Sequence, residues 1–205
     1  MKLVALFSGG FDSFVAAQIM AEKGHEIILL HAEIGDYSSN KSQCSKCVDA
    51  FQKLNGGKTD FYCFDHSHCL DTFIKKAPKK YICILCKRMM LHVAEAFCKA
   101  HNYDAILTGE NVAQVASQTL QNLMVETNAV NIPIIRPLVA YDKQQIIDKA
   151  KELGVYEILS SAGSCSAAPN NAPASVKLEE ILSIEAGLDI NALVTDSLST
   201  LKLEA

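Results

Sequence analysis

The chain has 205 residues, of which 49% are hydrophobic, and its 19 basic and 23 acidic side chains give a net charge of −4. This composition excludes a disordered chain, and the length predicts one main domain. The slightly acidic balance excludes a molecule-wide positive field, so any nucleic acid must be held by a local patch.

Targeting and membrane signals are absent from this sequence. No apolar stretch approaches the ~20 residues of a membrane-spanning helix, and the N-terminus lacks the basic start and small-residue cleavage site of a signal peptide. We therefore expect a cytoplasmic protein with no membrane partner. In that reducing compartment the eight cysteines are not expected to form disulfides, and their spacing suggests metal or redox chemistry instead.

Short apolar runs alternate with helical patterns along the chain. The runs, rich in Val, Ile and Leu, predict buried strands over residues 2–7, 26–34, 60–64, 105–109 and 132–138. Helical spacing predicts helices over residues 14–24, 47–57, 89–102 and 141–154, and one more over 176–188. This alternation predicts the α/β fold class, with a doubly wound, mostly parallel sheet whose ligands gather at the carboxyl ends of the strands.

The stretch SGGFDS, residues 8–13, lies directly behind the first predicted strand. A strand that stops on Ser-Gly-Gly and restarts as a helix leaves backbone N–H groups free, which is the geometry that holds a phosphate. The patterns GxxxxGK[ST] and GxGxxG are both absent, so neither of those nucleotide motifs applies. The alternative is a tight Gly-Gly turn in which Ser or Asp caps the helix.

Four segments, in this order, resemble the PP-loop domain of the tRNA 4-thiouridine sulfurtransferases of the ThiI type. They are SGGFDS, CKRMM, TGENVAQVASQTLQNL and PIIRPLVAYDKQQIIDKAKELG. The resemblance covers nearly the whole chain and implies the adenine nucleotide alpha hydrolase-like PP-loop fold. It implies a PP-loop ATP pyrophosphatase domain over residues 1–165, followed by a Pro- and Ala-rich loop and a C-terminal helical extension over residues 166–205.

The resemblance implies ATP and Mg²⁺ as cofactors. Gly9 and Gly10 would let the backbone approach the pyrophosphate, Ser8 and Ser13 would donate hydroxyl hydrogen bonds, and Asp12 would help to hold magnesium. The other implied ATP contacts are Leu6, Phe7, His31, Ala32, Lys87, Gly109 and Gln118. For His31 and Gln118 the alternatives are a satisfied strand-end histidine and an ordinary polar residue of a helix.

The resemblance also implies a sulfur site. Cys165 matches the sulfur-handling cysteine of the family, and with Cys83 and Cys86 it resembles archaeal-type members in which three thiolates hold an iron–sulfur cluster. The implied catalytic residues are Cys165, Cys86 and Asp12, and the implied metal ligands are Cys83, Cys86 and Cys165. Residues 75–88 carry six positive and no negative side chains, which predicts a stabilised thiolate at the Cys-x-x-Cys pair.

The remaining cysteines leave alternatives open. Cys44 and Cys47 could join Cys83 and Cys86 in a four-thiolate zinc site, although zinc ribbons usually have a gap of ~15–20 residues between the pairs, shorter than the one in this sequence. They could instead be a redox pair or packed thiols. We expect Cys63, Cys69 and Cys98 to be ordinary buried thiols.

The function that this resemblance implies is ATP-dependent thiolation of a tRNA uridine, with AMP and pyrophosphate as products. Family members carry an N-terminal tRNA-binding region and many carry a rhodanese domain, and neither pattern is found in this sequence. We therefore expect help from a separate tRNA-binding protein or a second copy in a homodimer, with an unspecified sulfur donor. Two alternatives are adenylation of another substrate, and an ATP- and cluster-binding subunit without chemistry of its own.

Overall fold

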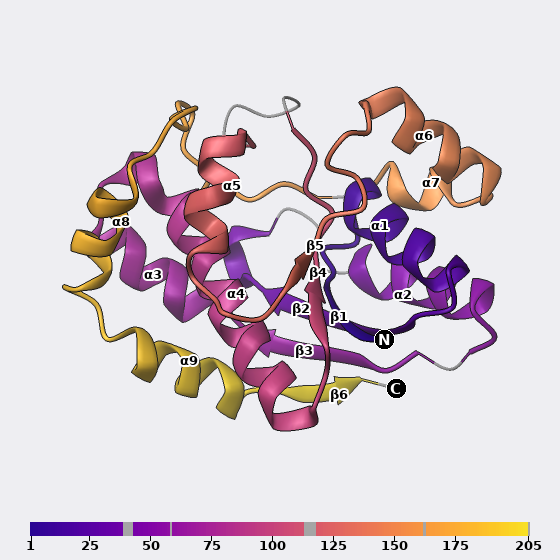
Figure 1. Ribbon diagram of the computed structural model, residues 1–205, viewed down its shortest axis with the longest axis horizontal. Coiled ribbons are helices and arrows are strands. Elements are labelled where there is room, and N and C mark those ends of the chain that lie inside the picture. The colour runs from indigo at the N-terminus through magenta and orange to yellow at the C-terminus, as the bar shows by residue number, and fades with distance from the viewer. Residues whose placement is uncertain (39–42, 58, 113–117, 162, 205) are drawn as a thin grey trace.

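The structure is a computed structural model that describes residues 1–38, 43–57, 59–112, 118–161 and 163–204 (Figure 1). Its centre is a six-stranded sheet in the order β5-β4-β1-β2-β3-β6. The strands are β1 (Lys2–Leu6), β2 (Glu26–Glu33), β3 (Phe61–Asp65), β4 (Ala105–Leu107), β5 (Ile134–Ile135) and β6 (Lys202–Glu204). All neighbouring pairs are parallel except β3 and β6, which are antiparallel. The predicted mostly parallel sheet is confirmed.

Strand β1 lies between β2 and β4 in the sheet. From β1, the strands β2 and β3 follow on one side, and β4 and β5 follow on the other side. Leu3 pairs with Ile27 on one side and with Ala105 on the other. In an open α/β sheet, ligands bind outside the carboxyl ends of the strands where the strand order reverses in this way. The segment SGGFDS, residues 8–13, begins at the end of β1, and we call it the glycine loop. The fold therefore favours this position for a ligand.

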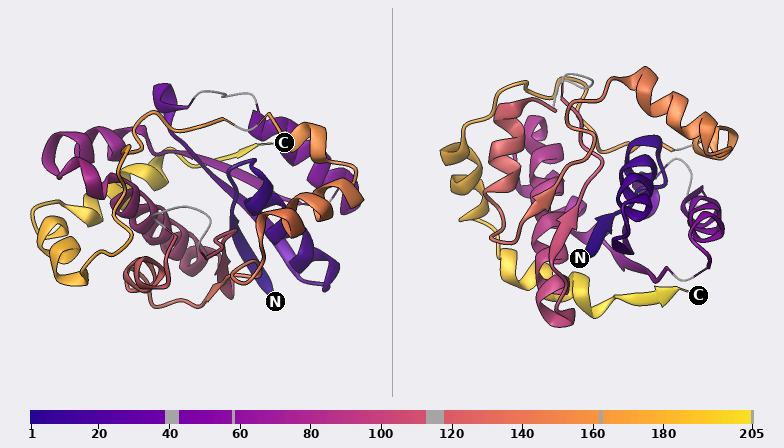
Figure 2. Two further views of the ribbon diagram at one scale, coloured as in Figure 1. Left: turned by 90° about the horizontal axis from the view of Figure 1, so that it is seen from above. Right: turned by 45° about the vertical axis from the view of Figure 1, so that its right-hand side comes forward.

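Helices cover both faces of the sheet (Figures 1 and 2). On one face lie α1 (Phe11–Glu22), α2 (Gln43–Leu54), α6 (Lys143–Glu152) and α7 (Tyr156–Leu159). The other carries α3 (Ser67–Lys76), α4 (Ile82–His101), α5 (Leu120–Thr127), α8 (Leu178–Glu185) and α9 (Ile190–Ser199). Two short 3₁₀ turns, η1 (Gly35–Tyr37) and η2 (Lys79–Tyr81), complete the described elements.

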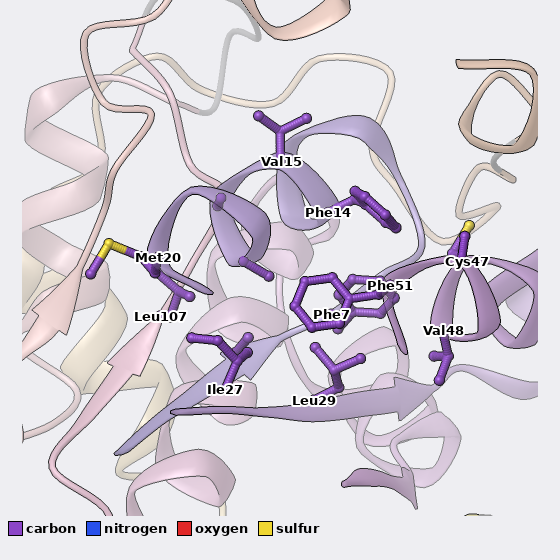
Figure 3. Packing of buried hydrophobic residues seen from close by; sticks show 14 of the residues in the cluster. Phe7, Phe14, Val15, Met20, Ile27, Leu29, Cys47, Val48, Phe51 and Leu107 are labelled. Carbon is purple, nitrogen blue, oxygen red and sulfur yellow. The ribbon is translucent and has the colours of Figure 1, made fainter. Parts of the chain in front are cut away.

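Successive side chains of β1 point to opposite faces of the sheet and pack into the hydrophobic core on each face. Leu3 and Ala5 pack with α1 and α2, whereas Val4 packs with α4. Beyond the end of the strand, Phe7 meets Phe14 and Phe51, with ring centroids 6.1 and 6.2 Å away (Figure 3). This aromatic cluster fixes the first helix directly behind the glycine loop.

The structure contains elements that the sequence patterns did not predict. Helices α3, α5, α7 and α9 were not expected, and neither was β6. Strand β6 pairs with β3 through Phe61–Glu204, Tyr62–Leu203 and Cys63–Lys202, so the predicted C-terminal extension contributes a strand to the sheet. Among the described residues, no helix is long and apolar enough to cross a membrane.

A buried ion pair fastens α8 to α4. Arg88 is 2% exposed, and its Nε and Nη2 atoms donate to the two carboxylate oxygens of Glu185 at 2.7 Å each. The guanidinium also donates to the carbonyl oxygen of Val125 at the end of α5. Arg88 therefore connects three helices of one face, and its positive charge is neutralised by Glu185 inside the protein.

We expect Arg88→Ala to lower the free energy of unfolding by about 3–5 kcal/mol, because it leaves the Glu185 carboxylate buried without its partner. Urea denaturation measures the change. The matched control is Lys2→Ala, which breaks an exposed 3.4 Å pair with Glu26 and should cost at most about 0.5 kcal/mol. A cost for Arg88→Ala as small as that of the control would contradict a structural role for the pair.

Candidate functional site

The glycine loop joins β1 to α1, and no side chain forms a hydrogen bond that caps the start of the helix. Gly9 has φ +76°, and the N-cap residue Gly10 is extended and makes no side-chain cap hydrogen bond. No side chain therefore caps the backbone N–H groups of the first turn of α1, which leaves them available to a phosphate. The alternative of a Ser- or Asp-capped helix is not what the structure contains.

Glycine is required at two points where backbones meet. A Cβ on Gly109, just after β4, would lie 2.4 Å from the carbonyl carbon of Asp12 and 2.5 Å from the nitrogen of Ser13. A Cβ on Gly9 would lie 3.1 Å from the Cα of Cys44, and the positive φ is itself unfavourable for other residues. The loop is thus held between the end of β4 on one side and the start of α2 on the other.

The two serines of the loop organise it from within. Ser8 and Ser13 hydroxyls are 3.0 Å apart, and the Ser13 hydroxyl also donates to the carbonyl oxygen of Gly10 at 3.1 Å. Asp12 points out of the loop, where its Oδ1 accepts from the Nζ of Lys143 at 2.8 Å. Lys143, at the start of α6, thereby places a cation beside the loop.

Two adjoining cavities open at the carboxyl ends of the strands. The large cavity, about 470 Å³, lies beyond β1 and β2, and the small cavity, about 220 Å³, lies between the glycine loop and the end of β4. Both include Leu6, Ser8 and Met90 in their walls, so they share one edge. The predicted residues on the large cavity are Leu6, Phe7, Ser8, His31, Ala32, Cys86 and Cys165. Those on the small cavity are Leu6, Ser8, Asp12, Ser13, Lys87, Gly109 and Gln118.

The structure therefore gathers most of the predicted site residues from distant parts of the chain. Three of them, Gly9, Gly10 and Cys83, are not wall residues of either cavity. Residues 113–117, which belong to the matched segment TGENVAQVASQTLQNL, lie outside the described residues. Gln118, which follows them, has a buried Oε1 without a hydrogen-bond partner among the described residues.

His31 is held as a neutral ring in the wall of the large cavity. Its Nδ1 lies 2.7 Å from the carbonyl oxygen of Phe7, so Nδ1 carries the proton and donates it. Burial lowers the pKa of His31, and the Phe7 carbonyl only partly offsets that effect. The ring thus presents an uncharged surface to the cavity.

Cys86 and Cys165 lie on the same wall of the large cavity. Both also pack against the small apolar cluster of Leu70, Ile82 and Ala167. The segment carrying Cys165 is fastened by a β-bridge between Ser38 and Cys165 and by the Ser166 N–H, which donates to the carbonyl oxygen of Tyr37 at 2.9 Å. The structure thus brings together two thiols that are far apart in the sequence.

The expected stabilisation of a thiolate by residues 75–88 is wrong for both thiols of the Cys-x-x-Cys pair. Burial raises the pKa of Cys83 and of Cys86, and repulsion from neighbouring thiols adds to the effect. Lys87 opposes the shift without reversing it. Arg88 contributes little positive charge there because it is buried in its pair with Glu185.

His66 is a neighbour of Cys86 that no sequence pattern indicated. Its ring is 0% exposed, and Nε2 lies 3.2 Å from the Cys86 sulfur. Burial lowers the pKa of His66 to about 4, so the ring is neutral. Nδ1 is buried without a partner among the described residues, and an orphaned buried N–H is rarer in proteins than an unpaired acceptor. Nε2–H therefore donates to the Cys86 sulfur.

The other five cysteines are buried, although Cys44 also lies on the wall of the large cavity. Cys63, Cys69 and Cys98 are core thiols, as expected, and burial raises the pKa of each, to about 12, 11 and 12 respectively. Cys44 and Cys47 pack in the core beside the glycine loop, where Cys47 donates to the carbonyl oxygen of Gly9 at 3.1 Å. Of the alternatives for Cys44 and Cys47, the structure therefore favours packed thiols.

No ready metal site is found in the part of the chain that the structure describes. Within it, no three His, Cys, Asp or Glu side chains are grouped so that they could hold a metal ion. The zinc alternative through Cys44 and Cys47 accordingly finds no grouped ligands. The three partly exposed thiols are Cys83, Cys86 and Cys165, and Cys165 contributes to the raised pKa of both Cys83 and Cys86.

The fold, the open glycine loop and the two cavities define a PP-loop protein of the adenine nucleotide alpha hydrolase-like fold. The family model described as thiamine biosynthesis protein (ThiI) matches residues 1–190, and the chain belongs to this family.

Known relatives agree with this assignment. The chain is 37% identical over 206 residues to a probable tRNA sulfurtransferase of Methanosarcina mazei, covering 98% of this chain and 51% of the relative. A probable tRNA sulfurtransferase of Methanocaldococcus jannaschii is 38% identical over 189 residues, covering 90% of this chain and 49% of the relative. The chain thus spans about half the length of the curated relatives it matches.

Solved structures show the same fold. The crystal structure of a 4-thiouridine synthetase–RNA complex with bound ATP superposes with a TM-score of 0.92 at 30% identity, covering 99% of this chain and 54% of that chain. The NMN synthetase of Francisella tularensis shares the fold alone, with a TM-score of 0.55 at 19% identity over 100% of this chain and 87% of the other.

We expect Gly109→Ala to weaken ATP binding by roughly tenfold or more, because the added Cβ overlaps the Asp12 backbone and displaces the phosphate-facing amides. Isothermal titration calorimetry measures the affinity. Gly187→Ala is the matched control, since its Cβ would meet only the Ile184 carbonyl oxygen at 3.4 Å. Wild-type affinity in Gly109→Ala would show that the close approach has no bearing on the loop.

Proposed function

We propose that this protein is an ATP-dependent sulfurtransferase that adenylates a tRNA uridine carbonyl and replaces its oxygen with sulfur. The observation that carries the proposal is that the glycine loop lines the small cavity and two partly exposed thiols, Cys86 and Cys165, line the large cavity that adjoins it. The likeness to an ATP-bound 4-thiouridine synthetase supports the same substrate pair.

The first half-reaction is adenylation of the acceptor. The triphosphate would lie on the open N–H groups of the first turn of α1, with the adenine in the large cavity against Phe7, His31 and Ala32. The uridine O4 oxygen attacks the α-phosphorus, the bond to the β-phosphate oxygen breaks, and pyrophosphate leaves. Lys87 and Lys143, which flank the loop, would hold the negative charge that develops on the phosphates.

Asp12 fits the role of a magnesium ligand. Its carboxylate lines the small cavity beside the loop, and carboxylate with phosphate oxygens is the donor set that Mg²⁺ prefers. The side chain is paired with Lys143, so binding of the ion would replace one cation by another at the same carboxylate. When bound, Mg²⁺ would neutralise charge on the departing pyrophosphate.

The second half-reaction delivers sulfur to the activated carbon. Hydrosulfide, supplied from solution and held at the Cys165 and Cys86 wall, would attack C4 of the uracil ring. The C4–O bond breaks as AMP leaves, and loss of the sulfur-bound proton gives the thiocarbonyl. His66, which donates to the Cys86 sulfur, would steady that sulfur as it gains negative charge. Cys165 is proposed as the sulfur-handling residue because it lies on the wall and its segment is fastened over the cavity.

We further propose that Cys83, Cys86 and Cys165 can hold an iron–sulfur cluster. What supports this is the donor chemistry: the three are partly exposed thiols, whereas the other five are buried. When bound, a cluster on three thiolates would supply an open iron for inorganic sulfide.

The chain would work in the cytoplasm, where thiols stay reduced. Its net charge of −4 attracts phosphate poorly, so the tRNA would be held by a separate tRNA-binding protein or domain, or by a second copy of the chain.

An anaerobic assay with ATP, Mg²⁺, sulfide and unmodified tRNA tests the function. We expect tRNA-dependent AMP, pyrophosphate and thiouridine from the wild type. Asp12→Asn should lose all three products, whereas Cys165→Ala should lose thiouridine while tRNA-dependent pyrophosphate release persists. The control Cys98→Ala, a buried thiol remote from both cavities, should keep every activity.

The same assay separates the alternatives. AMP formed without tRNA, with full activity in Cys165→Ala, would indicate a different acceptor. ATP binding without AMP under any condition would indicate a binding subunit. Either result would contradict the proposed reaction.

Anaerobic purification followed by iron, zinc and acid-labile sulfide analysis tests the sulfur site. We expect iron and labile sulfide in the wild type and their loss in Cys83→Ala, because that variant removes a cluster ligand without changing either cavity wall. Cys63→Ala, a core thiol, is the control and should keep the iron. Stoichiometric zinc without iron would contradict the cluster.

A further inference from the structure

A partly buried group of four charged side chains lies beside the small cavity. It consists of Lys87 on α4, Glu110 after β4, Glu126 on α5 and Arg136 after β5. Lys87 and Glu110 are wall residues of the cavity, whereas Glu126 lies behind them and is 0% exposed. The mechanism above gives no role to Glu126. We call these four residues the charged cluster.

The two carboxyl groups of the charged cluster are held very differently. Glu110 receives the Nζ of Lys87 at 3.1 Å, the Nε of Arg136 at 2.8 Å and the hydroxyl of Thr108 at 3.1 Å. Glu126 has only the Nζ of Lys87, 3.1 Å from its Oε1, and neither of its oxygens has an aligned hydrogen bond to a described residue. Negative charge is therefore well stabilised on Glu110 and poorly stabilised on Glu126.

The position of the proton follows from this asymmetry. Burial first, and then the adjacent Glu110, raise the pKa of Glu126 to about 9, whereas the pKa of Glu110 is lowered by Glu126, Lys87 and Arg136 despite its burial. Two carboxylates in contact are both acceptors and cannot bond to each other. One proton on Glu126 turns that contact into a hydrogen bond from Glu126 to Glu110.

The proton changes the charge that faces the cavity. With both carboxyl groups ionised, the two cations and two anions of the charged cluster cancel. With Glu126 protonated, one positive charge is left over, and Lys87 presents it at the cavity wall beside the glycine loop. Arg136 supports this surplus, because its buried Nη2 has no partner among the described residues.

We propose that Glu126 is a positioning residue that carries a proton when the site binds ATP, so that Lys87 keeps a positive charge free for the phosphates. This inference rests on the proposed function, because it takes the ligand of the loop to be ATP. It predicts that ATP binding above neutral pH is linked to uptake of a proton at Glu126. Glu126 is a wall residue of neither cavity and acts through its contacts with Lys87 and Glu110.

Other titratable groups near α5 do not reproduce this behaviour. Besides the charged cluster, α4 places Cys83 and Arg88 near Glu126, and Arg88 is paired with Glu185 of α8. Residues 173–176, which also contact α5, contain no titratable side chain. Deprotonation of Cys83 would persist in any variant of Glu126, so a substitution at Glu126 separates the two.

Glu126→Gln tests the inference because it mimics the protonated acid at every pH. By calorimetry, we expect wild-type ATP affinity to fall roughly tenfold between about pH 7 and about pH 10, the size of one lost charge-assisted contact, whereas Glu126→Gln changes by less than about twofold. Glu95→Gln is the matched control and should follow the wild type, since Glu95 is a buried acid of α4 that accepts the Asn131 and Ile132 N–H groups.

A second measurement needs no variant. Titration heats near pH 9 in two buffers of different ionisation enthalpy report protons taken up on binding, and we expect uptake there and none near pH 7, where Glu126 is already protonated. Equal pH dependence in wild type and Glu126→Gln, or no uptake near pH 9, would overturn the inference alone. Failure of the wild type to bind ATP at about pH 7 would overturn the proposed function as well.

Discussion

The contact between Gly109 and the backbone of Asp12 and Ser13 is the constraint on which the site depends. It presses the end of β4 against the glycine loop so closely that a Cβ would lie 2.4 Å from the Asp12 carbonyl carbon. β1 and β4 are adjacent at the point where the strand order reverses, so both loops emerge at the same edge. Gly109, Asp12 and Ser13 all lie on the wall of the small cavity at this contact.

The proposed sulfur chemistry and the proposed phosphate chemistry belong to two adjoining cavities. Lys87 faces the small cavity and Cys86, its neighbour in the sequence, faces the large one. Consecutive residues of a helix point about 100° apart, so one turn of α4 can serve both cavities. Met90, one turn further along, lies on both walls. The first turns of α4 thus place a thiol on the wall of the large cavity and a basic side chain on the wall of the small one.

Much of the fold and the position of the loop could be predicted from the sequence. The apolar runs gave the central parallel strands because those strands are buried on both faces, and SGGFDS marked the loop because an open helix start needs glycine. Strand β6 was missed because KLE carries no apolar run: its three residues are exposed and pair at an edge. Helix α5 was missed because its exposed Leu120 and Met124 obscure the helical pattern.

The relations within the site could not be read from the sequence in the same way. The contact of His66 with Cys86 joins the N-cap residue of α3 to α4, and the pair of Glu126 with Lys87 joins residues 39 positions apart. Desolvation also reversed a simple expectation, since the lysines around the Cys-x-x-Cys pair predicted a lowered thiol pKa, whereas the pKa of the partly exposed Cys86 is raised. Desolvation depends on packing from distant segments, which local charge counting cannot anticipate.

Hydrogen–deuterium exchange with and without ATP tests the central assignment most directly, because it reports each backbone amide of the loop. If the open start of α1 holds the phosphates, ATP should slow exchange in residues 8–13 and at Gly109 and Glu110, with smaller changes over the outer helices. Unchanged exchange in residues 8–13 at saturating ATP would contradict the assignment of this loop as the phosphate site.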